Sequence, residues 1–178
     1  NGGNGQNDKY VIYNYNEQLW YYGTINRDAW MDRGLRPFPI ATGSNYLYNH
    51  EKGYDDDGSA LNSSIESSQI DIGDGDRFAF ISQLIPDLTF NGSDADNPSV
   101  NITVEGRNFP GGDYLQSDTS AVTRTAVSTS TVPFEQWTNK ADIRVRGRAF
   151  NLSVSSSDSG VRWRLGSPRV QARPDGRR

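Results

Sequence analysis

The sequence contains no cysteine, one histidine and one methionine. Without cysteine no disulfide can form, so the fold must be held by packing and hydrogen bonds, which fits synthesis in a reducing cytoplasm. A zinc site needs three or four ligands drawn mostly from Cys, His and carboxylates. With one histidine and no cysteine, this chain offers few of the nitrogen and sulfur ligands, and we expect neither a metal nor another cofactor.

Long apolar runs are also missing. No segment approaches the ~18 consecutive apolar residues that a membrane helix needs, and no signal peptide is visible, so we expect no membrane insertion by this segment. The chain opens on "NGGNGQND" without methionine. We interpret this start as a trimmed or internal boundary, with the chain being a fragment of a longer one.

A third absence is helical periodicity, because no amphipathic 3.6-residue pattern persists anywhere. Only 34% of the residues are hydrophobic, 11% are aromatic, and mean hydropathy is −0.75. Glycine, serine, threonine, asparagine and aspartate are plentiful. Strands take up β-branched and aromatic residues, while Gly, Asn and Asp form turns. The composition therefore predicts an all-β fold with long loops.

Two regions of predicted strands follow each other along the chain. The second region begins near residue 60, and a spacing of roughly 8–12 residues per strand suits a propeller blade, a sandwich or a barrel. Strands are expected at 9–15, 18–25, 28–32, 38–42 and 45–51, and then at 64–73, 77–90, 99–109, 141–156 and 161–174. Residues 110–131, rich in Ser and Thr, are predicted to be a long loop or a ragged edge strand.

Charge is distributed unevenly. Residues 1–143 hold 9 basic and 20 acidic side chains, whereas residues 144–178 hold 9 arginines against Asp158 and Asp175. An acidic body with a basic end suits contact with a neighbouring acidic body or with nucleic acid.

The stretch "NHEKGYDDDG" at 49–58 is the most site-like part of the sequence. Its aspartates and Gly58 resemble part of a calcium loop, but the position of the closing glutamate is taken by Ser64. His50 and Glu51 are candidates for a metal or acid–base pair. We favour a third interpretation, in which they end a strand and "GYDDDG" is a solvated turn.

Other candidate sites are weaker. "DIGDGD" at 71–76 has the spacing of a tight turn, with Gly73 and Gly75 supplying positive φ, although a glycosidase carboxylate pair is an alternative. "FPGGDY" at 109–114 lacks the GK[ST] ending of a phosphate loop, and no nucleophile elbow lies near His50. We therefore expect no catalytic residue and no enzyme activity.

Arginines supply the more informative pattern. Arg144, Arg146 and Arg148 fall on one face of a predicted strand, and Arg162 and Arg164 share a face opposite Trp163. If the two strands are neighbours, their sheet presents a ladder of guanidinium groups, which suit carboxylates and phosphates. Three interpretations remain: a solvated outer face, a subunit interface with acidic loops, and contact with DNA phosphates.

Three segments carry a resemblance to a known family. They are "LYNHEKGYDDDG", "IDIGDGD" and the terminal "WRLGSPRVQARPDGRR". With the surrounding residues, which cover nearly all of the chain, they resemble the C-terminal part of the tail hub or nozzle proteins of short-tailed bacteriophages.

The resemblance implies a virion structural protein, made in the host cytoplasm and assembled into a ring of identical subunits through which DNA passes. It further implies a β-propeller with added β-sandwich parts, in which residues 1–60 are an antiparallel, propeller-blade-like region and residues 61–178 a β-sandwich. It also implies contacts with adjacent tail and adaptor proteins, and transient, non-specific contact with DNA in the lumen. On this interpretation Asp55, Asp56 and Asp57 pair with arginines of a neighbouring subunit and set its register.

The alternative function is a carbohydrate-binding or glycan-hydrolysing β-sandwich module of a phage tail. It depends on aromatic side chains that could stack on sugar rings if they are exposed. The candidates are Trp20, Tyr21, Tyr22 and Trp137.

Overall fold

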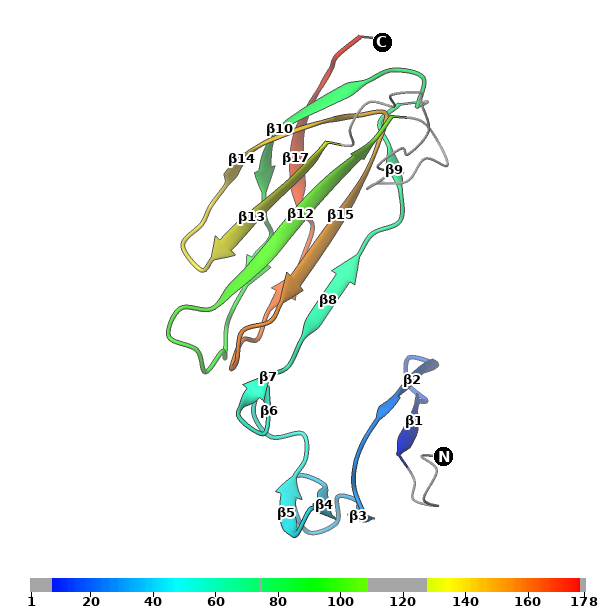
Figure 1. Cartoon of the computed structure of the whole chain (residues 1–178), viewed down its shortest axis with the longest axis vertical. Coiled ribbons are helices and arrows are strands. Elements are labelled where there is room, and N and C mark those ends of the chain that lie inside the picture. The colour runs from blue at the N-terminus through cyan, green and yellow to red at the C-terminus, as the bar shows by residue number, and fades with distance from the viewer. Residues whose placement is uncertain (1–7, 74, 109–127, 177–178) are drawn as a thin grey trace, which may run out of the picture. The chain divides into compact units, whose positions relative to one another are not determined.

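A computed structural model describes residues 8–73, 75–108 and 128–176 (Figure 1). The regular structure of these residues consists of β-strands without any helix, which confirms the all-β prediction. The chain divides into two compact units, Asn1–Gly53 and Tyr54–Arg178. The sequence predicted this division after residue 60. The difference arises because the segment from Tyr54 belongs with the second unit, where the guanidinium of Arg162 lies 5.3 Å from the centre of the Tyr54 ring.

The first unit contains a hairpin and a small sheet, both antiparallel. Its strands are β1 (Lys9–Asn14), β2 (Leu19–Thr24), β3 (Ala29–Met31), β4 (Ile40–Gly43) and β5 (Tyr46–Asn49). β1 pairs with β2, and β3-β4-β5 form the sheet. Each predicted strand of this region is present, slightly shorter than expected.

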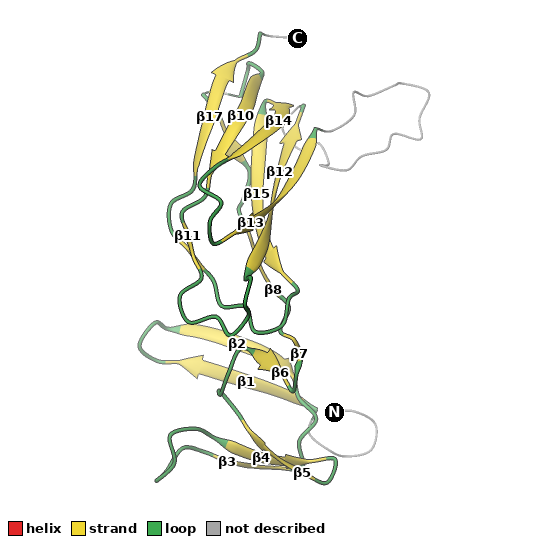
Figure 2. Cartoon of the chain, turned by 90° about the vertical axis from the view of Figure 1, so that its left-hand side faces the viewer, coloured by secondary structure: helices red, strands yellow, loops and turns green. Residues whose placement is uncertain are grey.

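The described residues of the second unit form twelve strands. They are β6 (Asp55–Asp56), β7 (Ser59–Ala60), β8 (Ser63–Glu66), β9 (Ile70–Asp71), β10 (Ala79–Ile85), β11 (Leu88–Thr89), β12 (Ser99–Arg107), β13 (Thr129–Glu135), β14 (Ala141–Gly147), β15 (Ala149–Ser156), β16 (Arg164–Leu165) and β17 (Arg169–Pro174). A three-stranded sheet has the order β14-β10-β17, and a five-stranded sheet has the order β13-β12-β15-β8 with β9 also on β15. Both views of the chain show these two sheets as layers of one unit (Figures 1 and 2).

One hydrophobic core lies between the two layers. On β12 the alternating Val100, Ile102 and Val104 form the buried face, because each is at most 2% exposed. Phe134 of β13 and Val145 of β14 are completely buried. The same core includes Ala79, Ile81 and Leu84 of β10 and Phe150 and Val154 of β15. Burial of these alternating side chains is the main favourable contribution to the stability of the unit.

The chain passes from one layer to the other at a sharp corner. Sequence reasoning predicted one strand over 141–156, but β14 ends at Gly147 and β15 begins at Ala149 in the opposite sheet. Between them, the backbone N–H of Arg148 donates to the carbonyl of Arg107 at 2.7 Å. Glycine is required here, because a Cβ on Gly147 would lie 2.9 Å from the oxygen of Arg107.

β13 lies partly in the segment predicted as a loop or ragged edge. It begins at Thr129 and continues past the predicted segment to Glu135, while residues 109–127 lie outside the described part. Pro133 within it lacks an N–H donor, which a strand tolerates at the edge of a sheet. β13 is the terminal strand of the five-stranded sheet, so Pro133 is accommodated.

Candidate functional site

The outward face of β14 carries the arginines that the sequence singled out. Along this strand Ala141, Ile143 and Val145 are buried and the residues between them point outward. Arg144 is exposed and Arg146 is half-buried on that outer face. Arg148 lies just beyond the strand, at the corner, so the three arginines are not equivalent.

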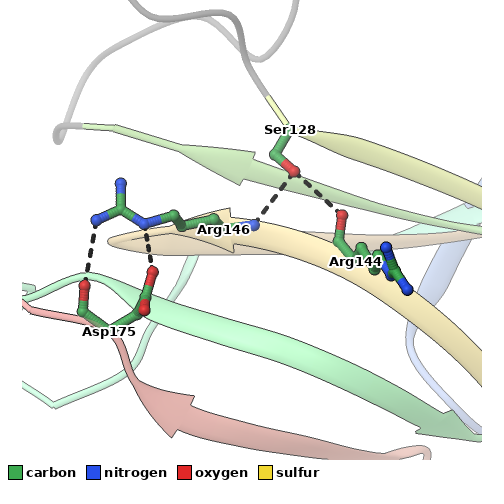
Figure 3. Close-up of polar contacts among 4 residues, drawn as sticks. All are labelled: Ser128, Arg144, Arg146 and Asp175. Carbon is green, nitrogen blue, oxygen red and sulfur yellow. Dashed lines mark hydrogen bonds and ion pairs between the residues drawn. The ribbon is translucent and has the colours of Figure 1, made fainter.

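Two of these arginines are held by contacts within the unit. The guanidinium of Arg146 lies 3.9 Å from the centre of the Phe78 ring, and that of Arg148 lies 4.9 Å from it. Arg146 also donates through Nε to Oδ2 of Asp175 at 2.5 Å and through Nη2 to the Asp175 carbonyl at 3.1 Å (Figure 3). Arg146 therefore ties the residue after β17 to β14, across β10.

The free edge of β14 is occupied by a side chain. The Ser128 hydroxyl donates to the carbonyl of Arg144 at 3.3 Å and accepts from the backbone N–H of Arg146 at 3.2 Å (Figure 3). Ser128 immediately precedes β13 of the opposite layer. It closes this side of the two-layer unit by satisfying backbone groups that an edge strand otherwise leaves open.

The condition for a shared arginine ladder, that the two arginine-bearing strands are neighbours, is not met. Arg162 precedes β16, and Arg164 lies in it, but β16 pairs with β11, whereas β14 pairs with β10. The two arginine groups are therefore not on neighbouring strands. The sequence could not settle this condition. The alternation of side chains along one strand predicts which residues share a face, but not which distant strand lies beside it. Trp163 does point inward as expected, packing on the core while its Nε1 donates to Ser63 Oγ at 2.8 Å.

A different arginine joins the outer face instead. Arg146 of β14, Phe80 of β10 and Arg173 of β17 lie in one row across the sheet. The Arg173 guanidinium lies 5.0 Å from the centre of the Phe80 ring. Sequence reasoning missed this row because β17 was predicted without a partner strand.

Neutral substitution distinguishes the two β14 arginines. We expect Arg146→Met to destabilise the second unit by about 1 kcal/mol, because it removes a cation–π contact and charge-assisted hydrogen bonds at a partly exposed site. Arg144→Met keeps the exposed aliphatic stem and should change stability by less than about 0.5 kcal/mol. Urea unfolding of both variants measures the difference, and equal effects would contradict the assigned contacts.

The acidic stretch at 49–58 forms a turn. Asp55 and Asp56 make up β6, which pairs with β7, and the connecting Asp57 and Gly58 have φ of 53° and 83°. Positive φ at both central positions is the geometry of a type I′ hairpin turn, for which Asp-Gly is a preferred sequence. Asp55 Oδ1 accepts from the backbone N–H of Gly58 at 3.3 Å. Within the described residues, no group of three or more His, Asp or Glu could hold a metal ion.

The aspartates and the β14 arginines do not meet within the unit. Asp55, Asp56 and Asp57 are exposed in the β6–β7 hairpin. Figure 1 places this hairpin at the end of the second unit away from the β14–β15 corner. A pairing between these acids and the arginines therefore requires a second molecule, and it stays a prediction.

His50 and Glu51 belong to the packing of the first unit. Arg27 Nε donates to His50 Nε2 at 3.0 Å, and the Trp30 ring lies 4.7 Å from the imidazole, centre to centre. Glu51 forms an ion pair with Arg33. The stretch "DIGDGD" at 71–76 also has turn geometry, because Gly73 and Gly75 have φ of 72° and 70°.

The β1–β2 hairpin has apolar side chains on both faces. Residues directly opposite each other share a face, so the register places Val11, Tyr13, Trp20 and Tyr22 on one side and Tyr10, Ile12, Leu19 and Tyr21 on the other. The first set is 47–87% exposed and the second 38–52%. Consecutive apolar residues in "YVIY" and "LWYY" are the sequence signal for strands covered on both faces.

A cleft of about 1050 Å³ lies within the first unit. Tyr10 and Ile12 of the hairpin line it together with Trp30, Asp28 and Asp32. The indole Nε1 of Trp30 donates to Asp32 Oδ1 at 2.7 Å. The cleft therefore combines aromatic surface with carboxylates.

Comparison with known proteins identifies no relative. No protein-family model matches the chain, and no curated protein matches it. Between residues 8 and 176, leaving aside 74 and 109–127, no helix is long and apolar enough to cross a membrane.

Proposed function

We propose that this chain is a structural subunit of a virion, part of an oligomeric tail hub or nozzle ring of a short-tailed phage through which DNA passes. The observation that carries the assembly part of this proposal is the hairpin β1–β2, which exposes apolar side chains on both faces. The tail assignment rests on the sequence resemblance. It entails a virion location, contacts with adjacent tail and adaptor proteins, and no enzymatic role.

The physical argument starts from the weakness of an isolated hairpin. A two-stranded hairpin is at best marginally stable in water, and contiguous exposed apolar surface marks a site of contact with another macromolecule. The hairpin's two apolar faces suit a sheet that is covered from both sides. Stacked propeller blades cover their sheets in this way, which supports the blade-like interpretation of the first unit, and the two-layer second unit fits the sandwich.

The charge balance supports a DNA conduit. Residues 1–143 carry 20 acidic against 9 basic side chains. An acidic wall repels phosphates and lets DNA pass without tight binding. The exposed Arg144 and the acidic β6–β7 hairpin supply opposite charges for contacts between neighbouring subunits, where such pairs fix register more than affinity.

Assembly tests the proposal directly. Val11 and Tyr22 are direct partners on one face, so Val11→Lys with Tyr22→Lys should lower the oligomer mass, measured by mass photometry at micromolar concentration. The substitutions should weaken association at least about tenfold, the effect of losing roughly 1.4 kcal/mol at a contact, and phage carrying them should show a lower infectious titre. Glu17→Lys, in the turn of the same hairpin, is the control. A wild-type chain that stays monomeric, or a double variant that assembles normally, contradicts the proposal.

The cleft of the first unit favours glycan binding as a second candidate function. Sugar sites combine an aromatic platform with a few polar groups, and Trp30 beside Asp28 and Asp32 provides both. Binding on a glycan array that is lost in Trp30→Ala supports this candidate. No signal at high protein concentration argues against it.

A further inference from the structure

The second unit is closed along one side and open along the other. On the closed side, Ser128 bridges β13 and the edge of β14. On the open side lie β17, at the end of the three-stranded sheet, and β8 with β9, at the end of the five-stranded sheet. In the part of the chain that the structure describes, β17 pairs only with β10, and β8 and β9 pair only with β15.

Among the described residues, the apolar side chains that point inward along this open side are left partly exposed. Val170 lies opposite the buried Leu84, Ile65 opposite the buried Val154, and Ile70 opposite the buried Phe150, so all three face the space between the layers. They are nevertheless 45%, 52% and 52% exposed. A hollow of about 330 Å³ continues the opening near Ile72, Phe78 and Pro174. We call this surface, from β8–β9 to β17, the open seam.

The outward positions of the two edge strands carry opposite charges. Arg173 shares the outer face with Phe80, and Arg169 lies opposite the exposed Ile85, so β17 is basic outside. Glu66 pairs with Ser153 and Asp71 with Ala149, so the outward faces of β8 and β9 carry acidic side chains. None of the three uncovered inward positions holds a charge, although an inward-pointing charge is a common device against edge-to-edge pairing.

The strand directions allow a two-fold arrangement. β14 runs toward the Arg148 corner and β15 away from it, so β8, antiparallel to β15, runs toward the corner. β17 is antiparallel to β10, which is antiparallel to β14, so β17 runs toward the corner as well. A two-fold axis parallel to the strands exchanges the layers and keeps the strand direction. It therefore sets β17 of one copy parallel to β8–β9 of the other, twice.

We infer that the open seam binds a second copy of this chain through these two strand pairs. Each three-stranded sheet then continues into the five-stranded sheet of its partner. The uncovered Ile65, Ile70 and Val170 of both copies meet in a shared core, and Arg169 and Arg173 meet Glu66 and Asp71. This inference concerns the second unit alone and does not depend on the tail assignment.

A charge-swap mixture tests the arrangement with the full chain. The variant Arg169→Glu with Arg173→Glu places acids against acids at both contacts of its own dimer. Glu66→Arg with Asp71→Arg places arginines against arginines. We expect each variant alone to dimerise at least tenfold more weakly than wild type in analytical ultracentrifugation, and an equimolar mixture to recover dimer, because both contacts of the mixed pair are complementary. Failure of the mixture to exceed the separate variants would overturn the inference.

Cross-linking gives a second readout that does not depend on the charge variants. Because the chain has no native cysteine, Ser64→Cys or Glu66→Cys in one preparation can be mixed with Arg169→Cys or Gln171→Cys in another. At least one mixture should form a disulfide-linked heterodimer upon mild oxidation, in higher yield than either preparation alone. Thr131→Cys, on β13 at the closed side, is the matched control and should not link to Gln171→Cys. A wild-type chain that is monomeric at about 100 micromolar, or a Gln171→Cys preparation that links equally well to the Thr131→Cys control, would refute the seam dimer.

Discussion

Replacing Phe134 by alanine is expected to destabilise the second unit by about 3–5 kcal/mol. Phe134 is completely buried on β13 and belongs to the core shared by both layers. Its removal loses the transfer free energy of the ring and leaves a cavity. The strands around it cannot fill this cavity, because their registers are fixed by pairing on both sides of β12.

Urea unfolding followed by tryptophan fluorescence measures this loss. Trp137→Ala is the control, since Trp137 lies just after the same strand but is 79% exposed. It should change the free energy of unfolding by no more than about 0.5 kcal/mol. Similar midpoints for both variants would mean that the layers do not enclose Phe134.

The second large effect is expected at the corner between the layers. Gly147→Ala should cost at least about 2 kcal/mol, because overpacking displaces backbone as well as side chains there. The added Cβ would lie 2.9 Å and 3.0 Å from the backbone oxygen and nitrogen of Arg107, and 3.0 Å from the Cα of Gly106. None of these atoms belongs to a flexible side chain that can move aside.

Gly106 offers an independent check of the same close contact between backbone segments. A Cβ there would lie 2.7 Å from the carbonyl oxygen of Arg146, so Gly106→Ala should be comparably destabilising. Gly34→Ala meets no atom within 4 Å and serves as the neutral control. Thermal unfolding that is unchanged in both corner variants would show that the sheets are further apart at this corner than described.

The alternation of apolar and polar residues predicted the strands well where it was regular. β12 is the best case, because Val100, Ile102 and Val104 alternate with polar residues and all three are buried. The boundary between β14 and β15 was missed because residues 141–156 read as one extended run. The corner is set by the approach of Gly147 to Gly106, about forty residues earlier in the chain, which no short window of sequence contains.

For the candidate surfaces, too, local pattern predicted some features and missed others. Alternation along β14 correctly placed Arg144 and Arg146 on the outer face, and Asp-Gly at 57–58 correctly indicated a turn. The neighbour of each strand could not be predicted, so a ladder that includes Arg162 and Arg164 was only a conditional expectation. The structure places Arg173 in the row of Arg146 instead. Strand neighbours depend on pairings between distant segments, and side-chain periodicity along one strand does not show which segments pair.

The position of β10 has a consequence for biosynthesis. Both of its partners lie far downstream, since Ala79 pairs with Gly147 and with Pro174. On the ribosome, β10 must therefore wait, with Ile81 and Leu84 unprotected, for roughly 60 further residues before β14 is translated and roughly 90 before β17 is. We expect nascent chains arrested before residue 169 to recruit chaperones and to be cut readily by protease, and chains that carry β17 clear of the exit tunnel to become resistant in a single late step.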